Sequence, residues 1–143
     1  MQSNVLIPGK LLVVKVVIYG AGSIGCYLGA VLHNQGINVE LLGRERLQKV
    51  VSRRDGIQIT DYENRDDFVS NVSYVTDVSV LSKADIVLVT LKCTAMDEAA
   101  EVLAEHCKSD ALIVCLQNGV GAEQAVTSRV KQAKVVCGIV PFN

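Results

Sequence analysis

Three glycines stand at the spacing G-x-G-x-x-G near the start of the chain, directly after an apolar run. In such a motif the first glycine permits a tight turn, the second lets the backbone approach a pyrophosphate, and the third lets a helix pack closely on its strand. A helix that begins there offers unpaired N–H groups and partial positive charge to an anion. The motif therefore predicts dinucleotide binding, the alternative being a strand–helix turn without a ligand. The residues of this predicted site are Gly20, Ala21, Gly22, Ser23, Ile24 and Gly25.

The residue that chooses between NAD and NADP is expected about 20 positions further on, where an NAD site carries an acidic side chain for the ribose hydroxyl. This chain has Arg44 there, 19 residues after Gly25. A guanidinium pairs bidentately with phosphate, whereas a carboxylate repels it. The sequence thus favours NADP, with Arg44 on the 2′-phosphate. Two alternatives stay open: Arg44 is an ordinary solvated cation at a helix start, or Glu45 reaches an unphosphorylated ribose.

Two more polar residues directly follow apolar segments that look like buried strands. Lys92 ends the run Val-Thr-Leu-Lys, and Asn118 stands in Gln-Asn-Gly-Val-Gly. Ligands of open α/β sheets bind outside the carboxyl ends of the strands, so both residues are predicted to bind the cofactor. Lys92 is placed to meet a phosphate, a ribose or a substrate carboxylate, and Asn118 a nicotinamide ribose or a substrate hydroxyl. The alternatives are a solvent-facing lysine in a loop and a simple Asn-Gly turn.

Composition excludes several classes of function. Half of the 143 residues are hydrophobic and the net charge is −1, which indicates neither a nucleic-acid nor a membrane partner. No apolar stretch approaches the ~18 residues that a bilayer requires. Five scattered cysteines without a C-x-x-C pair, together with two isolated histidines, predict neither a metal site nor a disulfide framework. We expect reduced thiols and a cytoplasmic location.

Strands and helices alternate along the chain with the spacing of βαβ units. Helices are expected at residues 23–34, 45–54, 96–107 and 123–130. Strands are expected at residues 11–19, 39–42, 57–60, 68–75, 86–91, 112–116 and 134–140, with a polar hairpin tip or surface loop at 61–67. This order predicts an α/β fold: a Rossmann-type, doubly wound, mainly parallel sheet with helices on both faces. Residues 15–143 would form one dinucleotide-binding domain, and residues 1–14 an extension or tag-like segment.

The combination of motifs resembles ketopantoate reductase (2-dehydropantoate 2-reductase). The resemblance covers the chain from about Lys15 onward. The glycine motif is shared by many dehydrogenases, but the Thr-Leu-Lys and Asn-Gly-x-Gly segments are more particular to this family. Its members reduce 2-dehydropantoate to (R)-pantoate with NADPH, on the route to pantothenate and coenzyme A. The resemblance implies that the glycines hold the pyrophosphate, Arg44 the 2′-phosphate, and Lys92 and Asn118 the nicotinamide end.

One departure from the family is large. Its members continue into a helical domain that supplies the catalytic lysine and most contacts to the keto-acid substrate, and this sequence holds no counterpart. Lys92 matches a different family position, so we expect no catalytic residue in this chain and negligible reductase activity from it alone. A domain parted from its helical partner would expose an apolar patch, so a homodimer is allowed. The alternative functions are the cofactor domain of another NADP-dependent 2-oxo or 3-hydroxy acid dehydrogenase, and a nucleotide-sensing regulatory domain.

Overall fold

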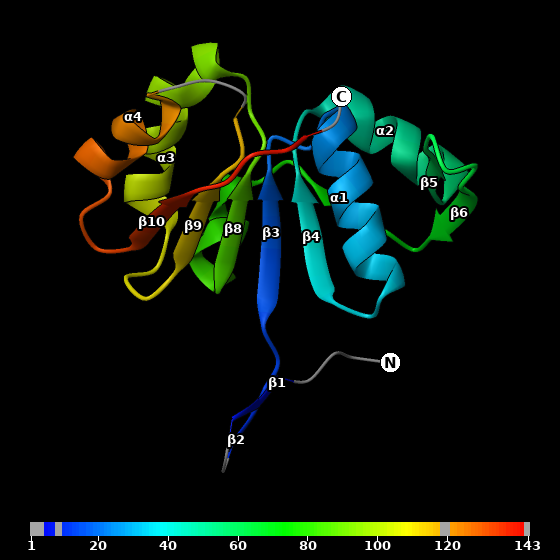
Figure 1. Ribbon diagram of the computed structural model, residues 1–143, viewed down its shortest axis with the longest axis horizontal. Helices are drawn as coiled ribbons and strands as arrows, with labels where there is room; N and C mark the ends of the chain where they lie inside the picture. The colour runs from blue at the N-terminus through cyan, green and yellow to red at the C-terminus, as the bar shows by residue number, and fades with distance from the viewer. Residues whose placement is uncertain (1–4, 8–9, 118–120, 142–143) are drawn as a thin grey trace.

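A six-stranded parallel sheet forms the centre of the molecule (Figure 1), in a computed structural model that describes residues 5–7, 10–117 and 121–141. The strands lie in the order β10-β9-β8-β3-β4-β7. Their bounds are β3 Lys15–Tyr19, β4 Asn38–Leu42, β7 Ser73–Val75, β8 Ile86–Val89, β9 Leu112–Cys115 and β10 Lys134–Cys137. The chain winds outward from β3 in one direction and then, from β8, in the other. This is the doubly wound Rossmann order, and its topological switch point lies between β3 and β8.

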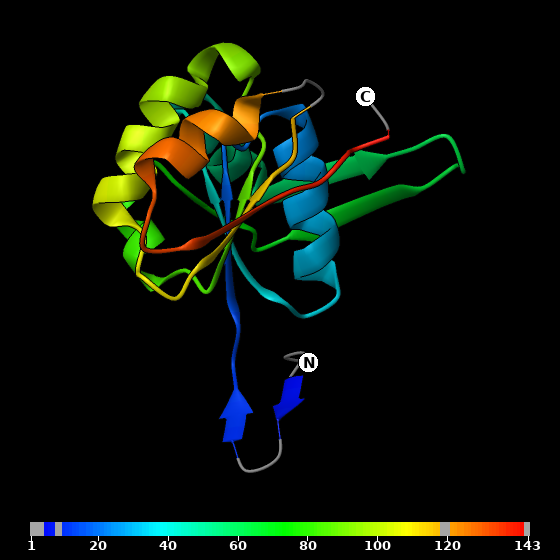
Figure 2. The same cartoon turned by 60° about the vertical axis from the view of Figure 1, so that its left-hand side comes forward.

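Helices cover both faces of the sheet. Figure 2 shows α3 and α4 on one side and α1 on the other. The helices are α1 Ser23–Asn34, α2 Glu45–Arg54, α3 Met96–His106 and α4 Ala122–Arg129, with 3₁₀ turns at Val78–Lys83 and Cys93–Ala95. Each face has its own apolar core: Val17, Leu103 and Val126 belong to one, and Ile18 and Leu41 to the other. Because β3 contributes to both, its residues Val16–Ile18 are buried on both faces, as expected of a central parallel strand. The predicted fold class is confirmed.

Two antiparallel hairpins lie outside the central sheet. One pairs β1 (Val5–Ile7) with β2 (Lys10–Leu12), and the other pairs β5 (Gly56–Thr60) with β6 (Asp66–Ser70). The second follows α2 and packs against α1 and α2. Its turn holds residues 61–65 of the polar stretch 61–67 that the sequence predicted as a hairpin tip or surface loop, whereas Asp66 and Asp67 already belong to β6.

The predicted strand at 11–19 is too long. Residues 10–12 pair with β1, and the central strand begins only at Lys15, opposite Asn38 of β4. Its other neighbour, β8, pairs from Val16 onward. Residues before Lys15 therefore have no central strand on either side to complete their hydrogen bonds, so apolar composition alone does not extend the strand.

The predicted strand at 68–75 is two strands. Asn71 has a left-handed backbone with φ 58° and separates β6 from β7. Strand β6 returns antiparallel along β5, whereas β7 runs parallel to β4 at the sheet edge. Asparagine adopts this conformation more readily than most residues, so a single position redirects the chain from the hairpin into the sheet. Among the described residues, no helix has the length and apolar character needed to cross a membrane.

Ion pairs and main-chain bonds hold the amino ends of the strands together. The Asp85 carboxylate accepts a hydrogen bond from the Lys15 main-chain N–H at 2.7 Å and pairs with the Lys108 ammonium. In return, the Asp85 N–H donates to the Lys15 carbonyl oxygen at 2.9 Å. Lys15 also pairs through its side chain with Glu40 at 2.9 Å. The starts of β3, β4 and β8 are thereby fixed relative to one another.

These contacts generate a prediction about pH. The Lys108 hydrogen bond, followed by that from the Lys15 N–H, lowers the pKa of Asp85 below its ordinary value. A depressed folded-state pKa means that the stabilisation is present above the unfolded pKa and is lost as the pH falls through the folded one. Asp85→Asn should cost about 1 kcal/mol of unfolding free energy at neutral pH. In urea titrations, the difference from the unaltered chain should shrink below about pH 4.

Asp110→Asn is the matched control, because Asp110 lies 3.9 Å from the same ammonium with its side chain 80% exposed. It should change the stability by less than about 0.5 kcal/mol. Equal effects of the two substitutions at neutral pH would contradict the role assigned to Asp85.

Candidate functional site

The glycine motif forms the turn from β3 into α1, as predicted. Gly20 has φ +95°, a left-handed backbone that glycine adopts without strain. The N–H groups of Gly20 and Ala21 both donate to the Leu42 carbonyl oxygen, at 2.9 and 3.0 Å. The turn is thus bonded to the carboxyl end of β4, two residues before Arg44.

The start of α1 is open toward a ligand. Gly22 is the N-cap residue, no side chain caps the helix, and no acidic residue stands in the first turn. A Cβ atom at Gly22 would meet only the Gly20 carbonyl oxygen within 4 Å, at 3.9 Å. The first N–H groups of this 12-residue helix therefore lie at the carboxyl edge of the sheet, with open space in front of them. This arrangement suits a phosphate or pyrophosphate.

The third glycine allows α1 to approach the switch point. A Cβ atom at Gly25 would lie 2.7 Å from the Thr90 hydroxyl oxygen and 3.0 Å from Cγ2 of Ile18. That hydroxyl donates to the Gly20 carbonyl oxygen at 3.0 Å. Thr90 follows β8, so the contact joins the ends of β3 and β8 beneath the helix. Sequence reasoning noted Thr90 as part of a family motif but gave it no role.

Tyr74 is a second supporting residue, which the sequence analysis missed. Its hydroxyl crosses from β7 to donate to the Ala21 carbonyl oxygen at 2.8 Å. A side chain at Gly43 would collide with this tyrosine. Burial raises the pKa of Tyr74 to about 12, so the hydroxyl stays protonated and able to donate further into the alkaline range than an ordinary tyrosine. The sequence signal for this contact was Gly43, directly after β4, together with an aromatic residue in β7.

Arg44 lies at the carboxyl end of β4, where the prediction requires it. It is exposed and is the N-cap residue of α2. Its guanidinium makes no hydrogen bond or ion pair with any residue that the structure describes. The rival residue Glu45 pairs with Lys49 at 2.7 Å along α2. The positive charge is thus available to a ligand, whereas the carboxylate already has a cationic partner.

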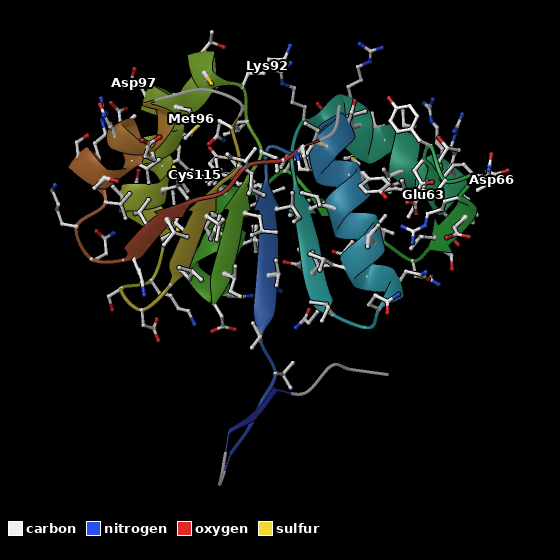
Figure 3. The ribbon with its side chains drawn as sticks, in the orientation of Figure 1. Glu63, Asp66, Lys92, Met96, Asp97 and Cys115 are labelled. Atoms are coloured by element: carbon white, nitrogen blue, oxygen red, sulfur yellow. The ribbon has the colours of Figure 1, made fainter. Side chains whose placement is uncertain are left out.

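Lys92 leaves the sheet at the same edge, after β8 (Figure 3). Its side chain is exposed, and its main chain caps the 3₁₀ turn Cys93–Ala95. Strand order therefore brings Arg44, the glycine turn and Lys92 to the ends of three adjacent strands, β4, β3 and β8. Asn118 lies outside the described residues. Gln117, which directly precedes it, is buried.

A cleft of ≈ 750 Å³ opens beside the start of α1. Ser23, Ile24 and Tyr27 line it on the helix, and residues 60–63 of the β5–β6 hairpin face them. Asp61 at this tip accepts hydrogen bonds from the main-chain N–H groups of Arg65 and Glu63. Two carboxylates in the lining, Asp61 and Glu63, make this cleft less suited to a pyrophosphate than the glycine turn is.

Comparison with known proteins points to one family. The family described as "Ketopantoate reductase PanE/ApbA" matches residues 16–143. A 2-dehydropantoate 2-reductase of Nostoc sp. is 30% identical over 125 residues, covering 87% of this chain and 38% of the relative. One of Halobacterium salinarum is 32% identical over 124 residues, covering 87% and 40%. The chain thus spans about two fifths of the length of the relatives it matches.

Solved structures agree. A PanE/ApbA family ketopantoate reductase from Ralstonia eutropha superposes with a TM-score of 0.77 at 31% identity, covering 86% of this chain and 40% of that one. D-mandelate dehydrogenase, solved with NADH and anilino(oxo)acetate, superposes with a TM-score of 0.74 over 90% of this chain and 41% of its own. At 22% identity, the second likeness shows the fold alone.

The close approach at Gly25 yields a prediction. Gly25→Ala places a methyl group against the Thr90 hydroxyl and the Gly20 carbonyl, and it should cost about 1–3 kcal/mol of unfolding free energy by overpacking. Gly22→Ala is the matched control in the same turn, because its Cβ meets open space. It should cost less than about 1 kcal/mol in chemical denaturation. The reverse ranking would contradict the packing described here.

Proposed function

The chain belongs to the ketopantoate reductase (PanE/ApbA) family, and from that premise we propose that it is the NADP-binding domain of a 2-dehydropantoate 2-reductase. This proposal is supported mainly by the groups that lie together at the carboxyl edge of the sheet. An uncapped helix start, an unpaired arginine and an exposed lysine follow three adjacent strands there. Family membership leaves the nucleotide-sensing alternative without support.

The residues fit the parts of NADPH by their chemistry. Main-chain N–H groups in the first turn of α1, which begins after Gly22, would bind the pyrophosphate, since no acidic side chain competes there. The Arg44 guanidinium would bind the 2′-phosphate. Lys92 would lie at the nicotinamide end, and we retain Asn118 in the proposal for the same end and for the substrate. When bound, NADPH supplies the hydride that reduces the ketone.

The proposed substrate is 2-dehydropantoate, a 2-oxo acid that is reduced to (R)-pantoate. Binding energy and orientation at the cofactor would come from residues 15–143, with residues 1–14 as an extension. The general acid would come from a helical domain beyond the length that this chain shares with its relatives. A general acid contributes roughly 10²–10⁴-fold to such a step, and Lys92 is assigned to the cofactor rather than to that role.

Cofactor preference tests the role of Arg44. The unaltered chain should bind NADPH more tightly than NADH in fluorescence titrations. Arg44→Ala should weaken NADPH binding by about ten- to a hundredfold, the worth of a charge-assisted hydrogen bond, and leave NADH binding unchanged. Arg54→Ala, an exposed arginine in the last turn of the same helix, is the control and should leave both unchanged. Equal affinity for the two cofactors in the unaltered chain would transfer the assignment to Glu45.

Activity tests the assignment of the general acid. The 143 residues alone should show no turnover of 2-dehydropantoate above background at saturating NADPH, while cofactor binding is retained. The measurement is NADPH absorbance in steady state, with a full-length family member as the positive control. Turnover that disappears in Lys92→Met would show that the general acid lies in this chain.

A further inference from the structure

Gln117 is a polar side chain in the buried interior of the protein. Within the part of the chain that the structure describes, it is the one polar side chain in a core otherwise made of apolar residues, with 9% of its surface exposed. It follows β9 by two residues, at the carboxyl edge of the sheet. Its polar groups must therefore find partners within the protein or remain unsatisfied.

The amide of Gln117 is half satisfied. Its N–H₂ group donates to the main-chain carbonyl oxygens of Val89, at 2.9 Å, and Leu91, at 3.2 Å. Its carbonyl oxygen Oε1 is buried without a partner among the described residues. Rotating the amide by half a turn would place this oxygen against two carbonyl oxygens. The contacts therefore fix the orientation, with the donors toward β8.

The unpaired oxygen indicates why the side chain is there. Leaving a buried acceptor without a partner is unfavourable, and an apolar side chain of similar volume would fill the space without that penalty. Gln117 is thus explained by its two donated hydrogen bonds rather than by packing. One bond ends on Val89, the last residue of β8, and the other on Leu91 in the short segment that follows.

That segment carries the predicted contacts with the nicotinamide end. Thr90, between the two carbonyl acceptors, is held on the glycine turn through Gly20, and Lys92 follows directly after Leu91. The Lys92 carbonyl oxygen accepts a hydrogen bond from the Ala95 N–H at 2.9 Å. On the amino-terminal side of Lys92, main-chain bonds hold the Val89 carbonyl and the Thr90 N–H, and Gln117 adds the bond that reaches the Leu91 carbonyl. The 3₁₀ turn holds the other side.

We propose that Gln117 is a positioning residue for cofactor binding: by holding the Val89 and Leu91 carbonyls, it sets where Lys92 leaves the sheet toward the nicotinamide half of the dinucleotide. The inference rests on the proposed function, which supplies the cofactor. It adds a residue that touches neither phosphate nor ribose and acts through Lys92. Its signature is a loss of affinity confined to the nicotinamide half.

The experiment compares two ligands by calorimetry on the 143-residue chain. NADPH spans the whole site, whereas 2′,5′-ADP carries only the adenosine half. Gln117→Met removes the donors at similar volume and should weaken NADPH binding about tenfold, the order expected for lost hydrogen bonds. Binding of 2′,5′-ADP should stay within about twofold, because the glycine turn and Arg44 keep their own anchors. An equal loss for both ligands, or no loss for NADPH, overturns the inference.

A matched control comes from Gln132. Its N–H₂ group also donates to a main-chain carbonyl, that of Ala104 at 2.9 Å, but on the exposed surface. Gln132→Met should leave both affinities unchanged. If Gln117→Met does not fold, Gln117→Leu also removes both donors without burying a charge and should give the same selective loss. Failure of both variants to fold assigns Gln117 to stability and overturns the proposal.

A double-mutant cycle tests the route of action. If Gln117 acts through Lys92, Gln117→Met should cost less than about twofold in NADPH affinity once Lys92 is already Met, because coupled residues are non-additive. Full additivity would overturn the positioning role even with cofactor binding intact. Binding of neither ligand to the unaltered, folded chain would instead refute the proposed function, and this inference with it.

Discussion

The close approach of α1 to the paired ends of β3 and β8 is the contact on which the rest of the candidate site depends. No side chain fits between Gly25 and the Thr90 hydroxyl, so the helix packs directly on the strand ends. That approach places the first N–H groups of α1 over the switch point. The hydroxyl also anchors the turn, by its bond to Gly20. Helix position and turn shape are thus set by the same threonine.

The charged side chains described at the two ends of the sheet differ in their pairing. At the amino end, Lys15 and Lys108 are paired with Glu40 and Asp85, and the charges serve the register of the strands. At the carboxyl end, Arg44 has no anionic partner among the described residues, and the start of α1 has no acidic side chain. Unpaired positive charge beside an open helix start is what a polyanionic ligand requires. The paired charges at the amino end therefore stabilise the fold, whereas the Arg44 charge at the carboxyl end has no anionic partner among the described residues.

The sequence predicted the sheet, its helices and the strand ends that carry the site, because these follow from local periodicity and from one glycine motif. It mispredicted the run at 68–75, since composition does not reveal that Asn71 adopts a left-handed backbone. It also missed the supports of the turn. Tyr74 and Gln117 act through partners 53 and 28 residues away in the chain, and no local pattern encodes such contacts. Arg44 was placed correctly because a strand end fixes its position, whereas Asn118 stays a prediction.

Strand order also has a consequence for folding kinetics. The strand that contributes to both cores, β3, is completed on one side by β4, but its other neighbour arrives only with Asp85 and the residues after it, 70 positions later. A ribosome-bound chain would therefore carry a half-covered apolar strand while those residues are synthesised, and closing so long a loop is entropically slow. The β5–β6 hairpin and α2 are made in that interval. They pack beside α1, on the side of β3 that β4 already covers. Until β8 emerges, this half-covered strand is apolar surface that a chaperone would protect.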